Sequence, residues 1–308
     1  MPKRILITGA SGLLGASLAW ELAPNHTVFG VTNSTPLQTD RFTVLTADLL
    51  DEGELKNLMD RTQPDWVIHC AAVANLETCE TKPTLARRLN SEIPGILADQ
   101  CRKGGARLLH VSTDAVFDGD KGDYVETDTT NPLSVYAQTK LEGEFAVAQA
   151  NPDAIVARVN LFGYSPSGKR SLAEFFLNNL LAGNRVKGFI DVFFCPMLVN
   201  EIAHVFTEML ENELSGLFHV FSADTMSKHA FGVAIAERFG LDTGLIAPIA
   251  VNDFGLAARR SPNLTMDTTK LSTALAHDLP TLSNMIERFY TLYQQDYPQV
   301  VRKMIPDA

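Results

Sequence analysis

A phenol and an ammonium group lie four residues apart in the sequence Tyr136-Ala-Gln-Thr-Lys140. On a helix this spacing places both side chains on one face. An isolated phenol has a pKa of about 10 and is a poor acid or base near neutrality, but a nearby positive charge lowers that pKa. The pattern therefore predicts proton transfer by Tyr136 with Lys140 tuning its pKa, although most pairs at this spacing are solvated surface pairs.

Two hydroxyl side chains, Ser112 and Thr113, follow the apolar residues of a buried strand predicted over 107–112. Because α/β sheets bind ligands at the carboxyl ends of their strands, one hydroxyl could hydrogen-bond to a substrate carbonyl and polarise it. The dipeptide Asn131-Pro132 marks a loop that leads into a helix predicted over 136–150, which places Tyr136 near its first turn. Both features favour a functional interpretation of the Tyr136–Lys140 pair.

A glycine-rich segment, Thr8-Gly9-Ala10-Ser11-Gly12-Leu13-Leu14-Gly15, separates a strand predicted over 4–8 from a helix predicted over 13–22. Glycines allow a tight turn and a close approach to a pyrophosphate, whose charge is bound by free N–H groups at the helix N-terminus. A purely structural turn is the alternative. The strand–glycine–helix context favours a dinucleotide-binding loop.

The end of the second predicted strand bears on which dinucleotide is bound. An acidic residue there would bind the ribose 2′-hydroxyl of NAD, but the chain has Val31-Thr32-Asn33-Ser34. Without a carboxylate to repel a 2′-phosphate, NADP(H) is favoured over NAD(H), although no arginine is present there to bind the phosphate. Asp48 and Leu49 could contact the adenine, with Asp48 accepting from its amino group; the alternative is a helix N-cap near Asp51.

The segments that must position these residues alternate between strand-like and helix-like patterns over the first half of the chain. This alternation predicts an α/β fold with a doubly wound parallel sheet. We expect a dinucleotide-binding domain over 1–163 and a smaller α-rich cap over 164–308, with segments of about 190–222 returning to the sheet. The remaining predicted strands cover 27–32, 42–46, 66–70 and 154–159, and the remaining predicted helices cover 51–61, 86–103, 172–182, 199–211 and 228–239.

The composition excludes several classes of protein. The 308 residues carry a net charge of −10, which argues against nucleic acid as a partner, and no apolar run is long enough to cross a membrane. The four cysteines lack metal-ligand spacing, so we expect a cytoplasmic, metal-independent protein with Cys70 and Cys101 buried. His69, His110 and His204 lie in apolar runs and are predicted to be packed. The segment 287–299 could dock as a helix on the cap or form a homodimer surface.

Longer stretches of the chain resemble the extended short-chain dehydrogenase/reductases, and within them the dTDP-4-dehydrorhamnose reductases. The glycine segment matches T-G-x-x-G-x-x-G, and the Tyr–Lys pair matches Y-x-x-x-K. The segment 111–119, V-S-T-D-A-V-F-D-G, is similar to V-S-T-D-Y-V-F-D-G of that group, and 131–144 is similar to N-P-L-N-V-Y-G-K-T-K-L-E-G-E. Further matches lie at 71–80, at Asn90, at 158–163 and at 260–264.

The resemblance implies a Rossmann fold and a reductase that transfers hydride from NADPH or NADH to the 4-keto group of a nucleotide-linked 6-deoxysugar. Thr113 would orient the carbonyl, Tyr136 would protonate the alkoxide, and Lys140 would tune Tyr136 and hold the nicotinamide ribose. Asn90 would support the site or merely pack in its helix, and Arg259 and Arg260 could meet the substrate diphosphate. The implied cofactor-binding residues are Gly9, Ser11, Gly12, Leu13, Leu14, Gly15, Asn33, Ser34, Asp48, Leu49, Ala71, Ala72, Val73, Tyr136 and Lys140. The implied substrate-binding residues are Ser112, Asp114, Asn160 and Arg260.

The chain departs from the group on the substrate side. Ala115 replaces a usual tyrosine, Lys228 and His229 follow a serine where an aromatic is usual, and Cys195-Pro196-Met197 replaces S-P-T. A nucleotide-sugar epimerase or dehydratase with bound NAD is one alternative, although Ala115 stands where a dehydratase would carry a second carboxylate. A non-catalytic regulatory subunit, like the β subunit of methionine adenosyltransferase, is another alternative.

Overall fold

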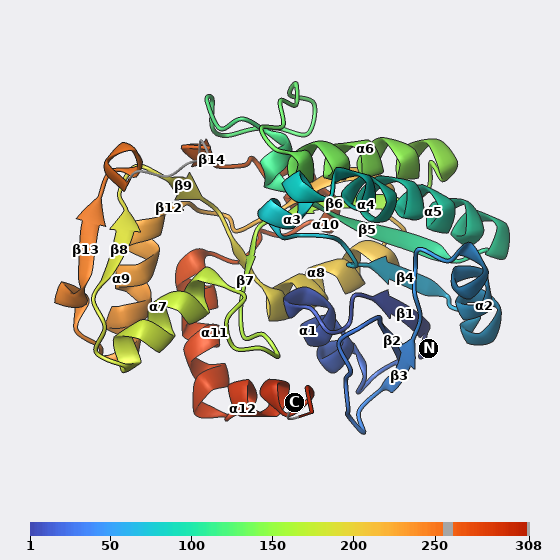
Figure 1. Cartoon of the computed structure of the whole chain (residues 1–308), viewed down its shortest axis with the longest axis horizontal. Helices are drawn as coiled ribbons and strands as arrows, with labels where there is room; N and C mark the ends of the chain where they lie inside the picture. Colours follow the sequence, from blue (N-terminus) through green and yellow to red (C-terminus); the bar gives the residue numbers. More distant parts are fainter. Residues whose placement is uncertain (255–260, 307–308) are drawn as a thin grey trace.

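The computed structural model describes residues 1–254 and 261–306 (Figure 1). Its centre is a seven-stranded parallel sheet with the spatial order β3-β2-β1-β4-β5-β6-β11. This order reverses between β1 and β4, as in a doubly wound sheet, so the predicted fold class is confirmed. The strands are β1 (Arg4–Thr8), β2 (Thr27–Thr32), β3 (Thr43–Thr46), β4 (Trp66–His69), β5 (Arg107–Thr113), β6 (Ile155–Val159) and β11 (Gly216–Val220).

Helices cover both faces of the sheet (Figure 1). In β1, Ile5 and Ile7 join the core formed with helices α1 and α8, whereas Leu6 joins the core formed with α2 and α5. Successive side chains of a strand point to opposite faces, so a strand covered on both sides must be apolar throughout. These helices are α1 (Leu13–Leu22), α2 (Glu52–Thr62), α3 (Leu76–Thr81), α4 (Pro83–Arg87), α5 (Ile93–Gly104), α6 (Val135–Ala150) and α8 (Val199–Glu211).

The long helix predicted over 86–103 is confirmed, but it is not regular along its whole length. Helix α4 ends at Arg87, a wider π-type turn covers Arg88–Glu92, and α5 starts at Ile93 with Pro94 in its first turn. A proline has no N–H to donate to the preceding turn and its ring clashes with the carbonyl there, so the regular helix must restart. The periodic apolar pattern continues across this break, which is why the sequence did not reveal it.

Most of the chain after Gly163, apart from α8, β11 and α10, builds a second lobe beside the sheet, seen at the left and bottom of Figure 1. Helix α9 packs against both α7 and α11 in this lobe. The helices of the lobe are α7 (Leu172–Leu181), α9 (Lys228–Phe239), α11 (Leu282–Gln294) and α12 (Tyr297–Arg302), whereas α10 (Thr269–Leu275) packs against β11. The short strands are β7 (Leu161–Phe162), β8 (Val186–Phe189), β9 (Phe193–Phe194), β10 (Met197–Leu198), β12 (Met226–Ser227), β13 (Ile246–Ile249) and β14 (Asn263–Leu264).

Three smaller expectations need correction. The C-terminal helix starts earlier than residue 287, and the chain breaks at Asp296, whose φ of 57° is left-handed, before α12 begins. His204 is exposed rather than packed, because it lies on the outer face of α8 while its neighbours Ala203 and Val205 are buried. Cys70 is only partly buried, whereas Cys101 is buried as predicted.

No described helix is both long and apolar enough to cross a membrane. Residues 1–254 and 261–306 also contain no cluster of three or more potential metal-ligating side chains.

Candidate active site

One cavity of about 660 Å³ lies at the carboxyl ends of β1, β4 and β5, where the strand order reverses. Open parallel sheets bind their ligands at this position. Every described residue that the sequence analysis proposed as catalytic, cofactor-binding or substrate-binding lines this cavity. Arg259 and Arg260 lie outside the described residues. Segments far apart in the chain, from Gly9 to Asn160, are thus brought to one site.

The glycine loop is shaped by two close backbone approaches. Gly9 has a left-handed φ of 70°, and a Cβ there would lie 2.8 Å from the backbone nitrogen of Ala71. A Cβ at Gly15 would lie 2.3 Å from the carbonyl oxygen of Gly9, so α1 can start this close to the loop only without a side chain. Gly12 occupies the N-cap of α1 and, among the described residues, no side chain caps this helix. The free N–H groups of its first turn can therefore bind an anion.

The far end of the cavity follows β2 and β3. Asn33 and Ser34 are exposed there, and the amide of Asn33 lies 3.5 Å from a carboxylate oxygen of Asp48. Asp51, and not Asp48, caps α2 by accepting from the backbone N–H groups of Gly53 and Glu54. Asp48 therefore remains available at the cavity, as the adenine-contact hypothesis requires.

Tyr136 and Thr113 lie together in the middle of the site. Ser134 caps α6 by accepting from Ala137, and the carboxylate of Glu80 accepts the N–H of Val135, which fixes Tyr136 in the first turn. The hydroxyls of Thr113 and Tyr136 both line the cavity, and Thr113 is near enough to act on the pKa of the Tyr136 phenol. A hydroxyl pair at this place can bind one carbonyl oxygen from two sides.

The expected lowering of the Tyr136 pKa is wrong. Desolvation of the phenol raises its pKa to about 12, although Thr113 acts in the opposite direction. Lys140 is not among the groups that shift this pKa, and its Nζ donates to the carbonyl of Val111 at 2.6 Å. Burial also lowers the pKa of Lys140 to about 8, so the protonated form of Lys140 is less favoured than it would be in water.

The substrate-side residues form two separate groups. Asp114 is buried, accepts from the amide of Asn160 at 2.6 Å and bonds to the Thr113 hydroxyl at 3.1 Å; burial raises its pKa. Ser112 lines the cavity, but its hydroxyl donates to Glu144 at 2.5 Å, so it is not free to bind a substrate carbonyl. The Thr113 hydroxyl also donates to a carboxylate, that of Asp114, but over 3.1 Å instead of 2.5 Å, so it is the more easily released of the two to a carbonyl beside Tyr136.

Asn90 connects the cavity wall to α6. Its amide oxygen accepts the N–H of Val73 at 2.8 Å, and its amide nitrogen donates to the Val73 carbonyl and to the Thr139 hydroxyl, each at 3.1 Å. Val73 lines the cavity and Thr139 precedes Lys140. Of the two interpretations left open by the sequence, the structure favours support of the site over simple packing.

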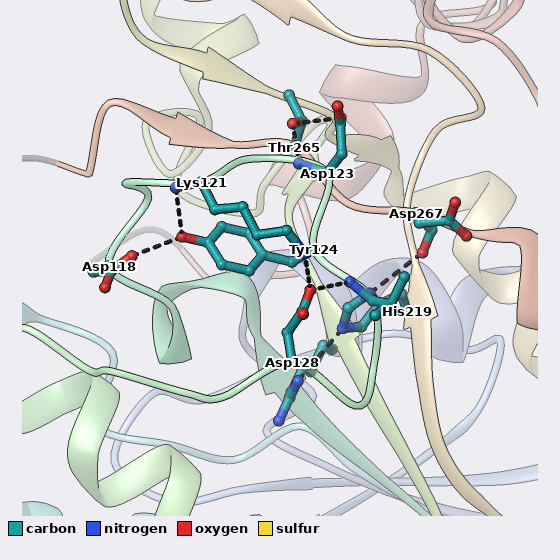
Figure 2. Close-up of polar contacts among 10 residues, drawn as sticks. Asp118, Lys121, Asp123, Tyr124, Asp128, His219, Thr265 and Asp267 are labelled. Atoms are coloured by element: carbon teal, nitrogen blue, oxygen red, sulfur yellow. Dashed lines mark hydrogen bonds and ion pairs between the residues drawn. The ribbon is translucent and has the colours of Figure 1, made fainter.

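A loop next to the site holds the second lobe. Figure 2 shows Tyr124 of this loop between Asp118, which accepts from its hydroxyl at 2.6 Å, and the N–H of Lys121. Its backbone N–H donates to the carbonyl of Thr265, whose hydroxyl donates to Asp123 at 2.8 Å (Figure 2). These contacts attach Thr265, in the segment that starts at Ser261, to the loop after Thr113.

Sequence reasoning missed some residues of the site. Arg170, in the loop between β7 and α7, lines the cavity although no motif marked it. His69 and His110 are buried, as predicted, and His110 in addition lies beside Lys140. Their contacts depend on the tertiary arrangement, and no spacing in the sequence could have indicated them.

The parallel sheet, the glycine loop at its switch point and the Thr113–Tyr136–Lys140 group together define an extended short-chain dehydrogenase/reductase fold. Within this class, the family described as "RmlD substrate binding domain" matches residues 3–295, and the chain belongs to this family.

Similar proteins include enzymes and a regulatory subunit. The chain is 33% identical over 284 residues to the "Probable low-salt glycan biosynthesis reductase Agl14" of Haloferax volcanii, covering 90% of this chain and 94% of that protein. It is 32% identical to the mouse "Methionine adenosyltransferase 2 subunit beta", covering 88% of this chain and 82% of that protein. The dTDP-4-dehydrorhamnose reductase of Bacillus anthracis, solved with NADP, has a TM-score of 0.82 at 22% identity, covering 94% of this chain and 99% of that one.

Proposed function

We propose that this protein is an NAD(P)H-dependent reductase of a nucleotide-linked 4-keto-6-deoxysugar. The observation that carries the proposal is that one cavity holds both an uncapped glycine loop and the Thr113–Tyr136–Lys140 group. The Agl14 reductase, similar over 90% of this chain, supports the same reaction class. A nicotinamide dinucleotide fits the cavity because Gly9 and Gly15 let the loop fold tightly against Ala71 and α1, which keeps the uncapped start of α1 at the cavity as a site for the pyrophosphate.

The side chains divide the work of carbonyl reduction. The glycine loop and Lys140 would hold a reduced nicotinamide dinucleotide, which would supply the hydride for the carbonyl carbon. Thr113 and Tyr136 hydrogen-bond to the carbonyl oxygen, and the Tyr136 hydroxyl gives its proton to the alkoxide that forms there. The raised pKa keeps Tyr136 protonated at neutral pH, as a proton donor must be. The ammonium of Lys140 stabilises the phenolate that remains.

The cofactor preference rests on the end of β2. Asn33 and Ser34, where an NAD-binding chain would carry an acidic residue, present no carboxylate to the cavity, and this supports NADP(H) over NAD(H). On the substrate side, Asp114 and Asn160 would bind sugar hydroxyls as a preformed, hydrogen-bonded pair.

The test is oxidation of NADPH or NADH in the presence of dTDP-4-keto-6-deoxy-L-mannose generated in the cuvette, with wild type beside Tyr136→Phe. We expect wild-type turnover and a loss of roughly 100-fold or more in Tyr136→Phe, with cofactor binding retained. Tyr290→Phe, a change on α11 outside the cavity, is the matched control and should keep the wild-type rate.

A regulatory subunit is the second candidate, because the β subunit of methionine adenosyltransferase is 32% identical over most of the chain. This candidate predicts cofactor binding without turnover on any 4-keto-sugar nucleotide. It also predicts that Tyr136→Phe still binds a methionine adenosyltransferase catalytic subunit. Wild-type turnover that depends on Tyr136 would contradict it.

A further inference from the structure

The loop between β7 and α7 brings a guanidinium group to the glycine loop. Arg170 lines the same cavity as Gly9 and Gly12, and its Nη1 lies 4.0 Å from the position that a Cβ of Gly12 would occupy. A Cβ at Gly163 would likewise lie 3.7 Å from the side chain of Leu13, so the start of this loop also lies against α1. Figure 1 shows the yellow-green segment after β7 passing beside α1.

We propose that Arg170 binds the pyrophosphate of the dinucleotide from the second lobe, opposite the N-terminus of α1. The inference rests on the nicotinamide cofactor of the proposed function and extends it to a residue of the other lobe. The glycine loop lies between Ser34, at the adenosine end of the cavity, and Lys140, at the catalytic end. The group that spans the middle of a dinucleotide is its pyrophosphate.

The backbone of this loop is built around one buried carboxylate. Glu174 is 2% exposed and accepts four hydrogen bonds: from the backbone N–H groups of Ser165, Arg170 and Ser171, and from the Ser165 hydroxyl. The Ser171 hydroxyl donates to the carbonyl of Gly163 at 2.7 Å. Glu174 thus fixes the backbone of the loop at Arg170 by accepting its N–H group, and the Arg170 guanidinium extends from this backbone into the cavity.

The charges favour an anion between the two lobes. The N-terminus of α1 carries the positive end of the helix dipole, has no acidic residue in its first turn and has no capping side chain among the described residues. The Arg170 guanidinium, which lies near this helix end, adds a full positive charge to it. In residues 1–254 and 261–306 we find no carboxylate paired with Arg170. A pyrophosphate, with a negative charge on each phosphate, would accept from both groups.

Binding measurements on the intact protein test the inference. We expect Arg170→Gln to weaken binding of NADPH and of ADP-ribose roughly 10-fold to 100-fold, because a charge-assisted hydrogen bond is lost. Arg170→Lys should retain part of the affinity, and added salt should weaken binding less in Arg170→Gln than in wild type. Lys169→Gln is the matched control: this exposed cation is adjacent but does not line the cavity, and its effect should stay within about twofold.

Equal dissociation constants for Arg170→Gln and Lys169→Gln would overturn the inference. It would also be overturned if Arg170→Gln raised only the KM for the sugar nucleotide and left the NADPH dissociation constant unchanged, because the guanidinium would then serve the substrate diphosphate. Thermal unfolding of the ligand-free variants should match wild type, which shows that a loss of affinity is not a loss of fold. A wild-type protein that binds neither NADPH, NADH nor ADP-ribose would instead refute the proposed function, and this inference with it.

Discussion

The Nζ atom of Lys140 lies 3.4 Å from Nε2 of His110, and both side chains are buried. For Nε2 to accept from an ammonium, His110 must be neutral with its proton on Nδ1. Burial, followed by the charge of Lys140 and the nearby ring of His69, lowers the pKa of His110 well below 6.5. Glu144 and Cys70 act on Lys140 in the opposite direction and favour its protonated form, but their effect on the Lys140 pKa is smaller than that of burial. The ammonium of Lys140 therefore lies in an environment that disfavours its charge.

This environment predicts that Lys140→Met stabilises the ligand-free protein while abolishing turnover. The pKa of Lys140 falls from 10.5 to about 8 on folding, so below pH 8 both states are protonated and the folded state carries the full cost of the buried charge. Between pH 8 and 10.5 the unfolded state binds more protons, so wild-type stability rises and the cost disappears.

We expect Lys140→Met to raise the free energy of unfolding by about 2 kcal/mol at pH 7, after allowing for the lost hydrogen bond to Val111. Urea unfolding at pH 7 and pH 10.5 measures both values, and the gain should be absent at the higher pH. Lys56→Met, at an exposed lysine paired with Asp60, is the control and should change stability by less than about 0.5 kcal/mol. A destabilised Lys140→Met at pH 7 would contradict the argument.

Asn90→Leu should weaken cofactor binding although Asn90 does not line the cavity. The change leaves the N–H of Val73 without its partner, leaves the Val73 carbonyl with only the Cys79 thiol as a donor, and removes the bond to Thr139. An unsatisfied buried polar group costs about 1 to 3 kcal/mol, and the cavity wall at Val73 should loosen. Thr139→Val keeps both bonds to Val73 and removes only the bonds of the Thr139 hydroxyl, to Asn90 and to the Tyr136 carbonyl, so it should have a smaller effect on the NADPH dissociation constant. If the order of the two variants were reversed, Asn90 would not position Val73.

The ion pair of Glu144 with Arg158 should be among the most sensitive polar contacts of the protein. The two side chains are 6% and 3% exposed and lie 2.7 Å apart, with the Ser112 hydroxyl as a further partner of Glu144. Glu144→Gln leaves a buried guanidinium without its counter-charge and should cost about 3 to 5 kcal/mol of stability. Glu142→Gln, on the same helix, breaks the exposed pair with Arg87 and should cost less than about 1 kcal/mol. Equal melting temperatures would show that Arg158 finds another partner.

Ser34→Asp should discriminate between the two nicotinamide cofactors. Ser34 lines the cavity at the end of β2, where a new carboxylate would repel a 2′-phosphate but not a 2′-hydroxyl. We expect the NADPH dissociation constant to rise roughly tenfold while that of NADH changes little. Ser34→Asn, an uncharged change of similar size, should leave the ratio of the two constants near its wild-type value. An equal loss for both cofactors would place the 2′-phosphate elsewhere.

The α/β alternation, the glycine loop and the α6 pair were predictable because their signals are local. Apolar runs such as 66–70 indicate strands buried on both faces, and a strand–glycine–helix sequence permits few other backbone shapes. The break at Arg88–Glu92 was not predictable from apolar spacing, since Pro94 is tolerated at a helix start and the buried positions keep their rhythm.

The sequence by itself thus determined the class of fold and which polar residues gather at the switch point of the sheet, because both follow from the order of short elements. Only the tertiary structure decided the electrostatics of those residues. Desolvation raises the Tyr136 pKa where residue types alone predicted a lower value, and Ser112 is engaged by Glu144. Arg170 reaches the glycine loop from more than 150 positions further along the chain. Burial and long-range contacts depend on how the elements pack, and no local pattern encodes them.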